Sequence, residues 1–328
     1  MRLFLGVDGG GSKTRFLLID EAGHMLASYT TGTAYYLEIG LEALEVLLTR
    51  GIQTTLEQAG VTAADLSFAF LGLPAYGEDR GLVPELDAAP AAVLPHGRYR
   101  CGNDMVCGWA GALAGADGIN IVAGTGSIAY GEFGGRSARA GGWGELFSDE
   151  GSAYWLAREG LRLFSRMSDG RTPRGPLYER LRSHFGLQED LDLCATVYGK
   201  SVAQRSQLAK LSKLVAEAAT AGDEAARGLF TAAVTELADV VDAVRLQLRV
   251  PSEVQLPVSY SGGLFRLREL LLKPLEAALE RRPQRYRFLA ARLPPEAGAA
   301  LRAARLGGAP LSAQSIAALE SAMHSQGV

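Results

Sequence analysis

The sequence predicts an α/β protein made of two similar lobes that flank a cleft. The chain has 328 residues, about twice the length of an ordinary domain. The order strand, glycine-rich turn, strand occurs twice, near residues 3–20 and 118–133. Glycine accounts for 40 of the 328 residues, and clustered glycines are typical of backbone that lies against a ligand. These observations predict a duplicated architecture whose binding cleft is assembled from distant segments.

The first lobe is expected to span residues 1–116. Apolar runs bounded by turn residues predict strands at residues 3–8, 14–20, 24–29, 67–73 and 99–104. A stripe of leucines predicts a helix over about residues 40–59, and another helix is expected at 105–114. The run Ala-Gly-Ala-Asp-Gly at 114–118 has the composition of a connector. A C-terminal helix at 312–328 is an optional addition to this lobe.

The second lobe is expected to span residues 117–311. Strands are predicted at residues 118–123, 128–133, 257–260 and 287–290. Helices dominate residues 153–248, which form a long insertion, and one long amphipathic helix begins near Asp223. Prolines 294 and 295 break the chain before two closing helices, which begin near residues 296 and 312.

Composition and charge exclude several kinds of partner. The formal net charge is −3, and the arginines at 281–287 are typical of a solvated loop, so we expect no nucleic-acid binding. No run of about 18 uncharged apolar residues occurs, so we expect no membrane span. The three cysteines have no metal-ligand spacing, which favours a reducing cytoplasm. The oligomeric state is left open, with a homodimer as one option.

The first glycine-rich turn has the chemistry of a phosphate-binding loop. The sequence from Gly6 to Thr14 has neither the spacing nor the following helix of a Walker A loop or a dinucleotide fingerprint. Backbone N–H groups without Cβ atoms can still surround an anion. Ser12 and Thr14 add hydroxyl groups, and Lys13 adds a positive charge. Asp8 would repel phosphate unless a cation lies between them, so it predicts Mg²⁺, held through water.

The alternative for this turn is a tight hairpin that needs glycine only for its backbone conformation, with a surface lysine. A second turn, Gly124-Thr-Gly-Ser127, repeats the same chemistry after another strand. A glycine pair, Gly262-Gly263, lies between a strand and a helix. Each turn alone is weak evidence, but the three together favour nucleotide binding.

These motifs resemble a known superfamily. Asp8–Thr14, Gly124–Ser127 and Ser261–Gly263 resemble the phosphate 1, phosphate 2 and adenosine motifs of the actin, Hsp70 and sugar-kinase superfamily. The block from Gly141 to Trp155, Gly-Gly-Trp-Gly-Glu-Leu-Phe-Ser-Asp-Glu-Gly-Ser-Ala-Tyr-Trp, resembles the signature of N-acetylglucosamine kinases. Their wider group is the BadF/BadG/BcrA/BcrD ATPase family. The resemblance implies two RNase H-like (actin-like ATPase) lobes of duplicated βββαβα type flanking an ATP/sugar cleft.

The resemblance also implies an activity, which is phosphoryl transfer from Mg·ATP to the 6-hydroxyl of an amino sugar. Asp104 matches the catalytic aspartate of the family; its alternative role is that of a helix N-cap. The expected ATP and Mg²⁺ contacts are Asp8, Gly10, Gly11, Ser12, Lys13, Thr14, Gly124, Thr125, Gly126, Gly222, Gly262 and Gly263. The expected sugar contacts are Ser127, Gly142, Trp143, Gly144 and Asp149. Trp143 has the alternative of an ordinary core residue.

Three departures from the family pattern leave the identity of the sugar open. Thr33-Ala-Tyr-Tyr36 stands where N-acetylglucosamine kinases carry a sugar-reading asparagine, Pro74–Glu78 replaces a serine-bearing turn, and Ile128 replaces another asparagine. N-acetylglucosamine is the first expectation, followed by N-acetylmuramic acid and glucosamine. The alternative functions are an activator ATPase of a dehydratase or reductase, and a non-catalytic sugar sensor.

Overall fold

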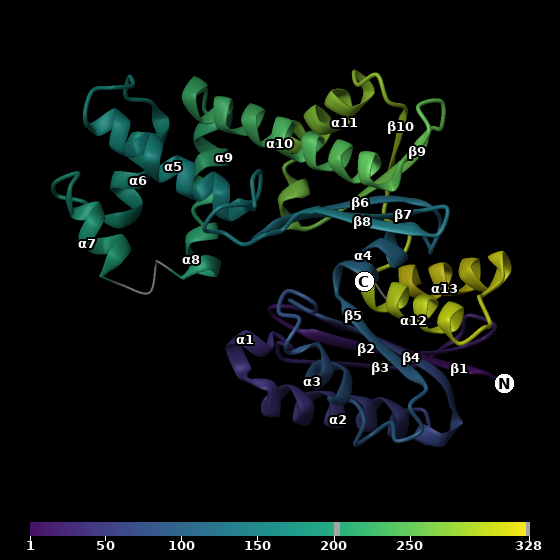
Figure 1. The fold of residues 1–328 in the computed structure, drawn as a ribbon. Helices are drawn as coiled ribbons and strands as arrows, with labels where there is room; N and C mark the ends of the chain where they lie inside the picture. Colours follow the sequence, from purple (N-terminus) through teal and green to yellow (C-terminus); the bar gives the residue numbers. More distant parts are fainter. Residues whose placement is uncertain (200–203, 326–328) are drawn as a thin grey trace. The chain divides into compact units, whose positions relative to one another are not determined.

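The computed structural model describes residues 1–199 and 204–325. The chain divides into two compact units (Figure 1). The first contains residues 1–117 and the chain from 290 onward, and the second contains residues 118–289. In the described residues, no helix is long and apolar enough to cross a membrane.

The first unit is built on a five-stranded sheet with the order β3-β2-β1-β4-β5. Strands β1, β2 and β3 are antiparallel neighbours, whereas β1, β4 and β5 run parallel. The parallel strands therefore end at the same edge of the sheet. The strands are β1 (Leu3–Gly9), β2 (Thr14–Asp20), β3 (Met25–Thr31), β4 (Leu66–Leu73) and β5 (Tyr99–Asn103).

Helices cover both faces of this sheet (Figure 1). The strand β2 shows why, because its apolar side chains alternate between two cores: Phe16 and Leu18 join one, and Leu17 and Ile19 join the other. The first core is completed by α2 and the second by α12 and α13. The helices of this unit are α1 (Tyr36–Ile39), α2 (Leu41–Gln58), α3 (Val83–Ala88), α4 (Met105–Ala112), α12 (Pro295–Leu306) and α13 (Ala313–Ser325).

The position of α12 differs from the sequence prediction, which placed residues 290–311 in the second lobe. The structure puts this helix in the first unit, where glycines let it approach its neighbours closely. A Cβ atom on Gly6 of β1 would lie 2.2 Å from the Ala300 backbone nitrogen. A Cβ atom on Gly298 would lie 2.2 Å from the Gly111 nitrogen of α4. Backbone contacts of this kind depend on two segments far apart in the sequence, so local patterns do not reveal them.

The second unit repeats the topology of the first. Its sheet has the order β10-β9-β6-β7-β8, which is the same arrangement counted from the opposite edge. Strands β6, β7 and β8 are antiparallel, and β6 runs parallel to β9. The strands are β6 (Gly118–Ala123), β7 (Ser127–Phe133), β8 (Arg136–Gly141), β9 (Leu256–Ser261) and β10 (Tyr286–Ala290).

The strand β8 was not predicted. Its sequence, Arg-Ser-Ala-Arg-Ala-Gly, lacks the β-branched and aromatic residues that favour strands. It forms because it pairs along its length with β7, from Phe133 opposite Arg136 to Ile128 opposite Gly141. The duplicated α/β architecture that the sequence predicted is nevertheless confirmed by the two sheets.

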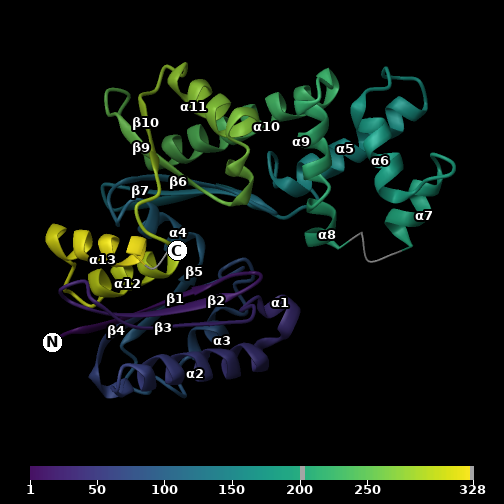
Figure 2. The same cartoon turned by 180° about the vertical axis from the view of Figure 1, so that it is seen from behind.

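Helices make up the rest of the second unit, and α10 and α11 lie on one face of its sheet (Figure 2). The long α10 begins at Asp223, whose carboxylate accepts a hydrogen bond from the Ala226 N–H at 3.0 Å and so caps the helix. The helices are α5 (Ala153–Ser168), α6 (Pro176–Phe185), α7 (Asp192–Tyr198), α8 (Arg205–Ala209), α9 (Ser212–Thr220), α10 (Glu224–Leu248) and α11 (Lys273–Glu280).

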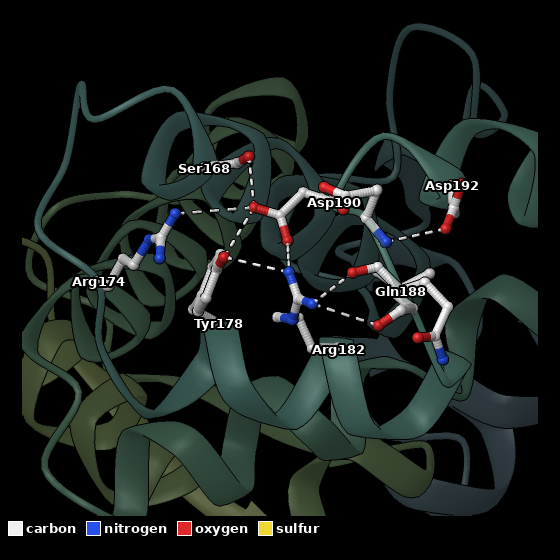
Figure 3. Close-up of polar contacts among 9 residues, drawn as sticks. Ser168, Arg174, Tyr178, Arg182, Gln188, Asp190 and Asp192 are labelled. Atoms are coloured by element: carbon white, nitrogen blue, oxygen red, sulfur yellow. Dashed lines mark hydrogen bonds and ion pairs between the residues drawn. The ribbon is translucent and has the colours of Figure 1, made fainter.

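A polar network around Asp190 ties α5 and α6 to the loop that precedes α7 (Figure 3). The Asp190 carboxylate accepts hydrogen bonds from the Ser168 hydroxyl at 2.6 Å and the Tyr178 hydroxyl at 2.7 Å. It also pairs with the Arg182 guanidinium. Burial alone would raise the pKa of Asp190, but these hydrogen bonds outweigh it and hold the pKa below its ordinary value. The network therefore stabilises the helical part of the second unit.

Candidate active site

Asp8 and Asp104 lie near the same edge of the first sheet. Asp8 is in β1 opposite Gly72 of β4, and Asp104 directly follows β5. The Asp104 backbone N–H donates to the Leu73 carbonyl at 3.3 Å. Gly72 permits this approach, because a Cβ atom there would lie 3.1 Å from the Asp104 Cα and 2.2 Å from the Cys107 Sγ. The structure therefore brings the predicted Mg²⁺-binding acid and the predicted base to one strand edge.

The side chains around this edge shift the pKa of both acids. Burial, Asp104 and Glu296 together raise the pKa of Asp8 to about 8, although Arg15 and Lys13 oppose the shift. Burial is also the largest cause that raises the pKa of Asp104, to about 6. Carboxylates gathered in this way repel one another, so the edge is suited to binding a cation.

The alternative role of Asp104, as the N-cap of α4, is filled by its neighbour. The Asn103 side-chain oxygen accepts a hydrogen bond from the Met105 N–H at 3.1 Å. The Asn103 amide in turn donates to the Tyr76 carbonyl at 3.2 Å, which fixes its orientation. Asn103 therefore satisfies the first N–H group of α4, and the catalytic role of Asp104 stays a prediction.

The first glycine turn is closed by its own backbone and braced by the segment after β3. The Gly10 N–H donates to the Lys13 carbonyl at 2.9 Å. The Gly10 carbonyl accepts from the Ala34 N–H at 3.2 Å and from the Thr33 hydroxyl at 3.1 Å. Thr33 is one of the residues that depart from the family pattern, and this hydrogen bond gives it a structural role.

The predicted phosphate contacts of this turn differ in exposure. Gly11, Ser12 and Lys13 are exposed. Thr14 is buried, and its hydroxyl donates to the Gly32 carbonyl at 2.8 Å. A direct contact of Thr14 with ATP thus remains a prediction, whereas its bond to Gly32 is a structural role that sequence reasoning missed.

The second glycine turn is braced by the beginning of α5. The Ala153 N–H donates to the Gly124 carbonyl at 2.9 Å, and the Tyr154 N–H donates to the Thr125 carbonyl at 3.2 Å. The first N–H groups of a helix have no partner within the helix, so they are available for such contacts. Ala153 and Tyr154 of the block 141–155 therefore hold the turn in place, and Thr125 is left exposed.

Ser127 and Asp149, two predicted sugar contacts, lie next to each other. The Ser127 N–H donates to the Asp149 carboxylate at 3.4 Å, and the Ser127 hydroxyl donates to the Glu150 carbonyl at 2.6 Å. Asp149 is 1% exposed and has a φ of 61°, which is uncommon for a residue other than glycine. Arg205 of α8 pairs with its carboxylate. Arg205 is in no motif, so the sequence contained no signal that would have identified it.

Trp143 lies in a different environment from Asp149. Gly141 and Gly142 have φ values of 71° and 67°, so the chain turns sharply before the tryptophan. The Trp143 side chain is 67% exposed, which rules out the core alternative, and the Arg139 guanidinium lies 5.3 Å from its ring centre. A hollow of about 380 Å³ opens here, lined by Gly141, Trp143, Phe147, Ser148, Glu150, Glu236, Asp239 and Val240, among others.

The glycines of the predicted adenosine motif follow β9, which runs parallel to β6. Gly262 has a φ of 106°, and a Cβ atom there would lie 2.3 Å from the Ala123 carbonyl oxygen. Glycine at this position therefore lets the motif pack against the residue that precedes the second glycine turn. Gly222 lies instead at the junction of α9 and α10, beside the capping residue Asp223.

Comparisons with known proteins agree with this architecture. Residues 5–303 match the BadF/BadG/BcrA/BcrD ATPase family. The chain is 26% identical over 308 residues to an N-acetyl-D-glucosamine kinase of Dictyostelium discoideum, covering 91% of this chain and 97% of that protein. It is 28% identical to an N-acetylmuramic acid/N-acetylglucosamine kinase of Clostridium acetobutylicum, covering 81% and 86%.

A crystal structure from Chromobacterium violaceum, of a protein described as a candidate N-acetylglucosamine kinase, superimposes on this chain with a TM-score of 0.70. The two sequences are 27% identical, and the match covers 92% of this chain and 98% of the other. The family match extends over both units and confirms the resemblance inferred from the motifs: the chain belongs to the BadF/BadG/BcrA/BcrD ATPase family.

Proposed function

We propose that this chain is an ATP-dependent amino-sugar kinase, which transfers the γ-phosphate of Mg·ATP to the 6-hydroxyl of N-acetylglucosamine or a close relative. The observation that carries the proposal is the pair of acids at one strand edge of the first unit, Asp8 and Asp104. Family membership and the kinases named among the relatives support it. N-acetylmuramic acid and glucosamine remain alternative substrates.

Asp104 would accept the proton of the sugar hydroxyl. Phosphoryl transfer depends mainly on positioning and charge neutralisation, so a carboxylate is a sufficient base. Its pKa of about 6 makes it a stronger base than an ordinary aspartate while leaving it mostly ionised at neutral pH. In the first unit, Ser12 and Lys13 would contact ATP phosphate oxygens through a hydroxyl and an ammonium group. Both side chains are exposed, so a ligand can reach them.

In the second unit, Thr125 would contact phosphate and Gly262 and Gly263 would lie against the adenosine. Ser127, Gly142, Trp143, Gly144 and Asp149 would bind the sugar. A buried carboxylate such as Asp149 is a strong acceptor for sugar hydroxyl groups. The exposed Trp143 ring offers an apolar face to the sugar or its acetyl group.

The residues present fit a magnesium ion. The Asp8 carboxylate supplies oxygen ligands, and burial together with the neighbouring acids Asp104 and Glu296 raises its pKa to about 8. The described residues contain no group of three or more side chains that could hold a metal by themselves. This suits Mg²⁺, which usually keeps several waters and binds one or two carboxylates together with substrate phosphates. Asp8 would hold the ion through water, and the bound ion would neutralise phosphate charge.

The burial of two of the three cysteines argues against the alternative function of an activator ATPase. Such activators bind an iron–sulfur cluster through cysteine thiolates. Cys101 and Cys107 are 4% and 0% exposed, and burial raises the pKa of both thiols. Only Cys194 is exposed among the three, so even a homodimer would offer two accessible thiols, fewer than the four that a cluster requires. The sensor alternative would not require the base, which this chain retains at Asp104. A cytoplasmic location is a further part of the proposal, and a homodimer is one option for the oligomeric state.

The test is a panel of amino sugars with Mg·ATP, in which ADP release and the phosphorylated product are measured. We expect at least one N-acylated hexosamine to stimulate ADP release and to be recovered as its 6-phosphate. Reactions without sugar provide the background rate of ADP release. If no sugar raises ADP release above that background, the kinase proposal is wrong.

A further inference from the structure

Arg205 connects two acidic residues of the block 141–155. It is the first residue of α8, and its guanidinium donates a hydrogen bond to the Asp149 carboxylate. Its Nε lies 3.5 Å from a carboxylate oxygen of Glu145. One positive charge therefore lies between two negative charges, and both come from the segment that is expected to bind the sugar.

Asp149 depends on this partner because it is almost completely buried. A carboxylate that is 1% exposed loses most of its hydration, which is unfavourable unless a charge or hydrogen bonds compensate. Burial raises the pKa of Asp149, while Arg205 and the Ser127 N–H act in the opposite direction. Arg205 is therefore the main group that favours the ionised form of this acid.

The ion pair also lies directly against the second glycine turn. A Cβ atom on Gly126 would be 2.4 Å from the Arg205 guanidinium and 2.9 Å from the Asp149 carboxylate. Any larger residue at this position would force the pair to shift. The glycine is thus explained by the packing of Arg205 and Asp149, in addition to any contact with phosphate.

We propose that Arg205 is a positioning residue, which holds the Asp149 carboxylate ionised and fixed against the glycine turn so that it can bind a sugar hydroxyl. This inference rests on the proposed function, since it assigns Asp149 to the sugar. In the opposite role, Arg205 would compete with the sugar for the Asp149 carboxylate, and the sugar would have to displace the Arg205 guanidinium. The two roles predict changes of opposite sign in the sugar KM.

The experiment compares Arg205→Met, Arg205→Lys and the control Arg180→Met, with kcat and both KM values measured for the sugar that the wild-type protein phosphorylates. Arg180 pairs with Glu217 on the surface of the same unit. We expect Arg205→Met to raise the sugar KM about tenfold or more, with the ATP KM changed by less than about threefold. Arg205→Lys, which keeps the charge, should recover part of the loss, and Arg180→Met should behave as wild type.

A sugar KM that is unchanged or lower in Arg205→Met would overturn the inference, and so would equal rises in both KM values with a lower melting temperature. A second measurement does not depend on activity. Melting temperatures of Arg205→Met, Asp149→Asn and the double variant form a cycle. If Arg205 acts through Asp149, the double variant should melt no lower than the less stable single variant. Additive losses of melting temperature would overturn the inference about Arg205. The absence of any phosphorylated sugar would refute the kinase proposal instead, so the two failures can be told apart.

Discussion

The two glycine turns occupy equivalent places in matching sheets, but different structures hold them. The first turn is braced by a loop, through the Thr33 hydroxyl and the Ala34 N–H on the Gly10 carbonyl. The second is braced by a helix, through the Ala153 and Tyr154 N–H groups. The same strand–turn–strand unit can therefore be stabilised by unrelated partners.

The charges of the two units differ as well. The first turn has Asp8 before it and Lys13 within it, and Asp104 lies near the same strand edge. The second turn has no ionisable residue of its own, and its nearest charges are the paired side chains of Asp149 and Arg205. The two units therefore share a similar backbone but differ in their charged residues. We expect the catalytic base only in the first unit and most of the sugar contacts in the second.

The largest expected effect tests the chemistry of the first unit. Asp104→Asn keeps the shape of the side chain but cannot accept a proton, so kcat should fall by a factor of about 10² or more. The KM for ATP should change little, because Asp104 is not expected to bind the nucleotide. Steady-state kinetics measure both values. Turnover close to wild type would remove Asp104 from the mechanism and with it the contrast between the units.

The next effect tests sugar recognition in the second unit. Trp143→Ala should raise the sugar KM about tenfold and the ATP KM much less, because the ring presents an apolar face to the sugar. The melting temperature should change little, since the side chain is 67% exposed. A large drop in melting temperature, or equal changes in the two KM values, would contradict this assignment.

A smaller effect tests the two segments that brace the glycine turns. Thr33→Val removes the hydroxyl that donates to Gly10, and Ser152→Ala removes the cap of α5, which accepts from the Trp155 N–H at 3.1 Å. Each substitution should lower the free energy of unfolding by about 1 kcal/mol. We expect each to raise the ATP KM a few-fold without a matching change in kcat. An effect of only one variant would show that only one turn contributes to nucleotide binding.

The smallest effect on the kinetic constants is expected for a region away from both turns. Asp190→Asn weakens the network of Figure 3, so it should lower the stability of the second unit by about 1–2 kcal/mol at neutral pH. Because the pKa of Asp190 in the folded protein lies below its ordinary value of 3.8, the stabilisation is present above that value and is lost as the pH falls through the lower folded value.

Thermal melting between pH 7 and pH 3 measures this dependence. The difference between wild type and Asp190→Asn should shrink as the pH falls below about 4. Both KM values should match wild type throughout, because the network is expected to serve stability alone. A constant difference at every pH would show that the Asp190 charge contributes nothing.

The sequence alone predicted the strand–turn–strand repeats and the family. These features are local, because glycine clusters and apolar periodicity report the backbone within a few residues. The matching sheets confirm the duplication, and the family match confirms the resemblance. The expected positions of Asp8 and Asp104 also follow from local patterns, because Asp8 lies near the end of the buried strand β1 and Asp104 directly follows β5.

Tertiary structure decided what depends on residues far apart in the chain. The helix α12 joins the first unit because Gly6 and Gly298 allow its backbone to lie against β1 and α4, which are far away in the sequence. The segment Arg136–Gly141 becomes the strand β8 because it pairs with the edge of β7. Arg205 acquires its position because a buried carboxylate requires a counter-charge, which no pattern near Asp149 reveals. Local residue patterns can predict where the chain turns, but only the folded chain determines which charges become neighbours.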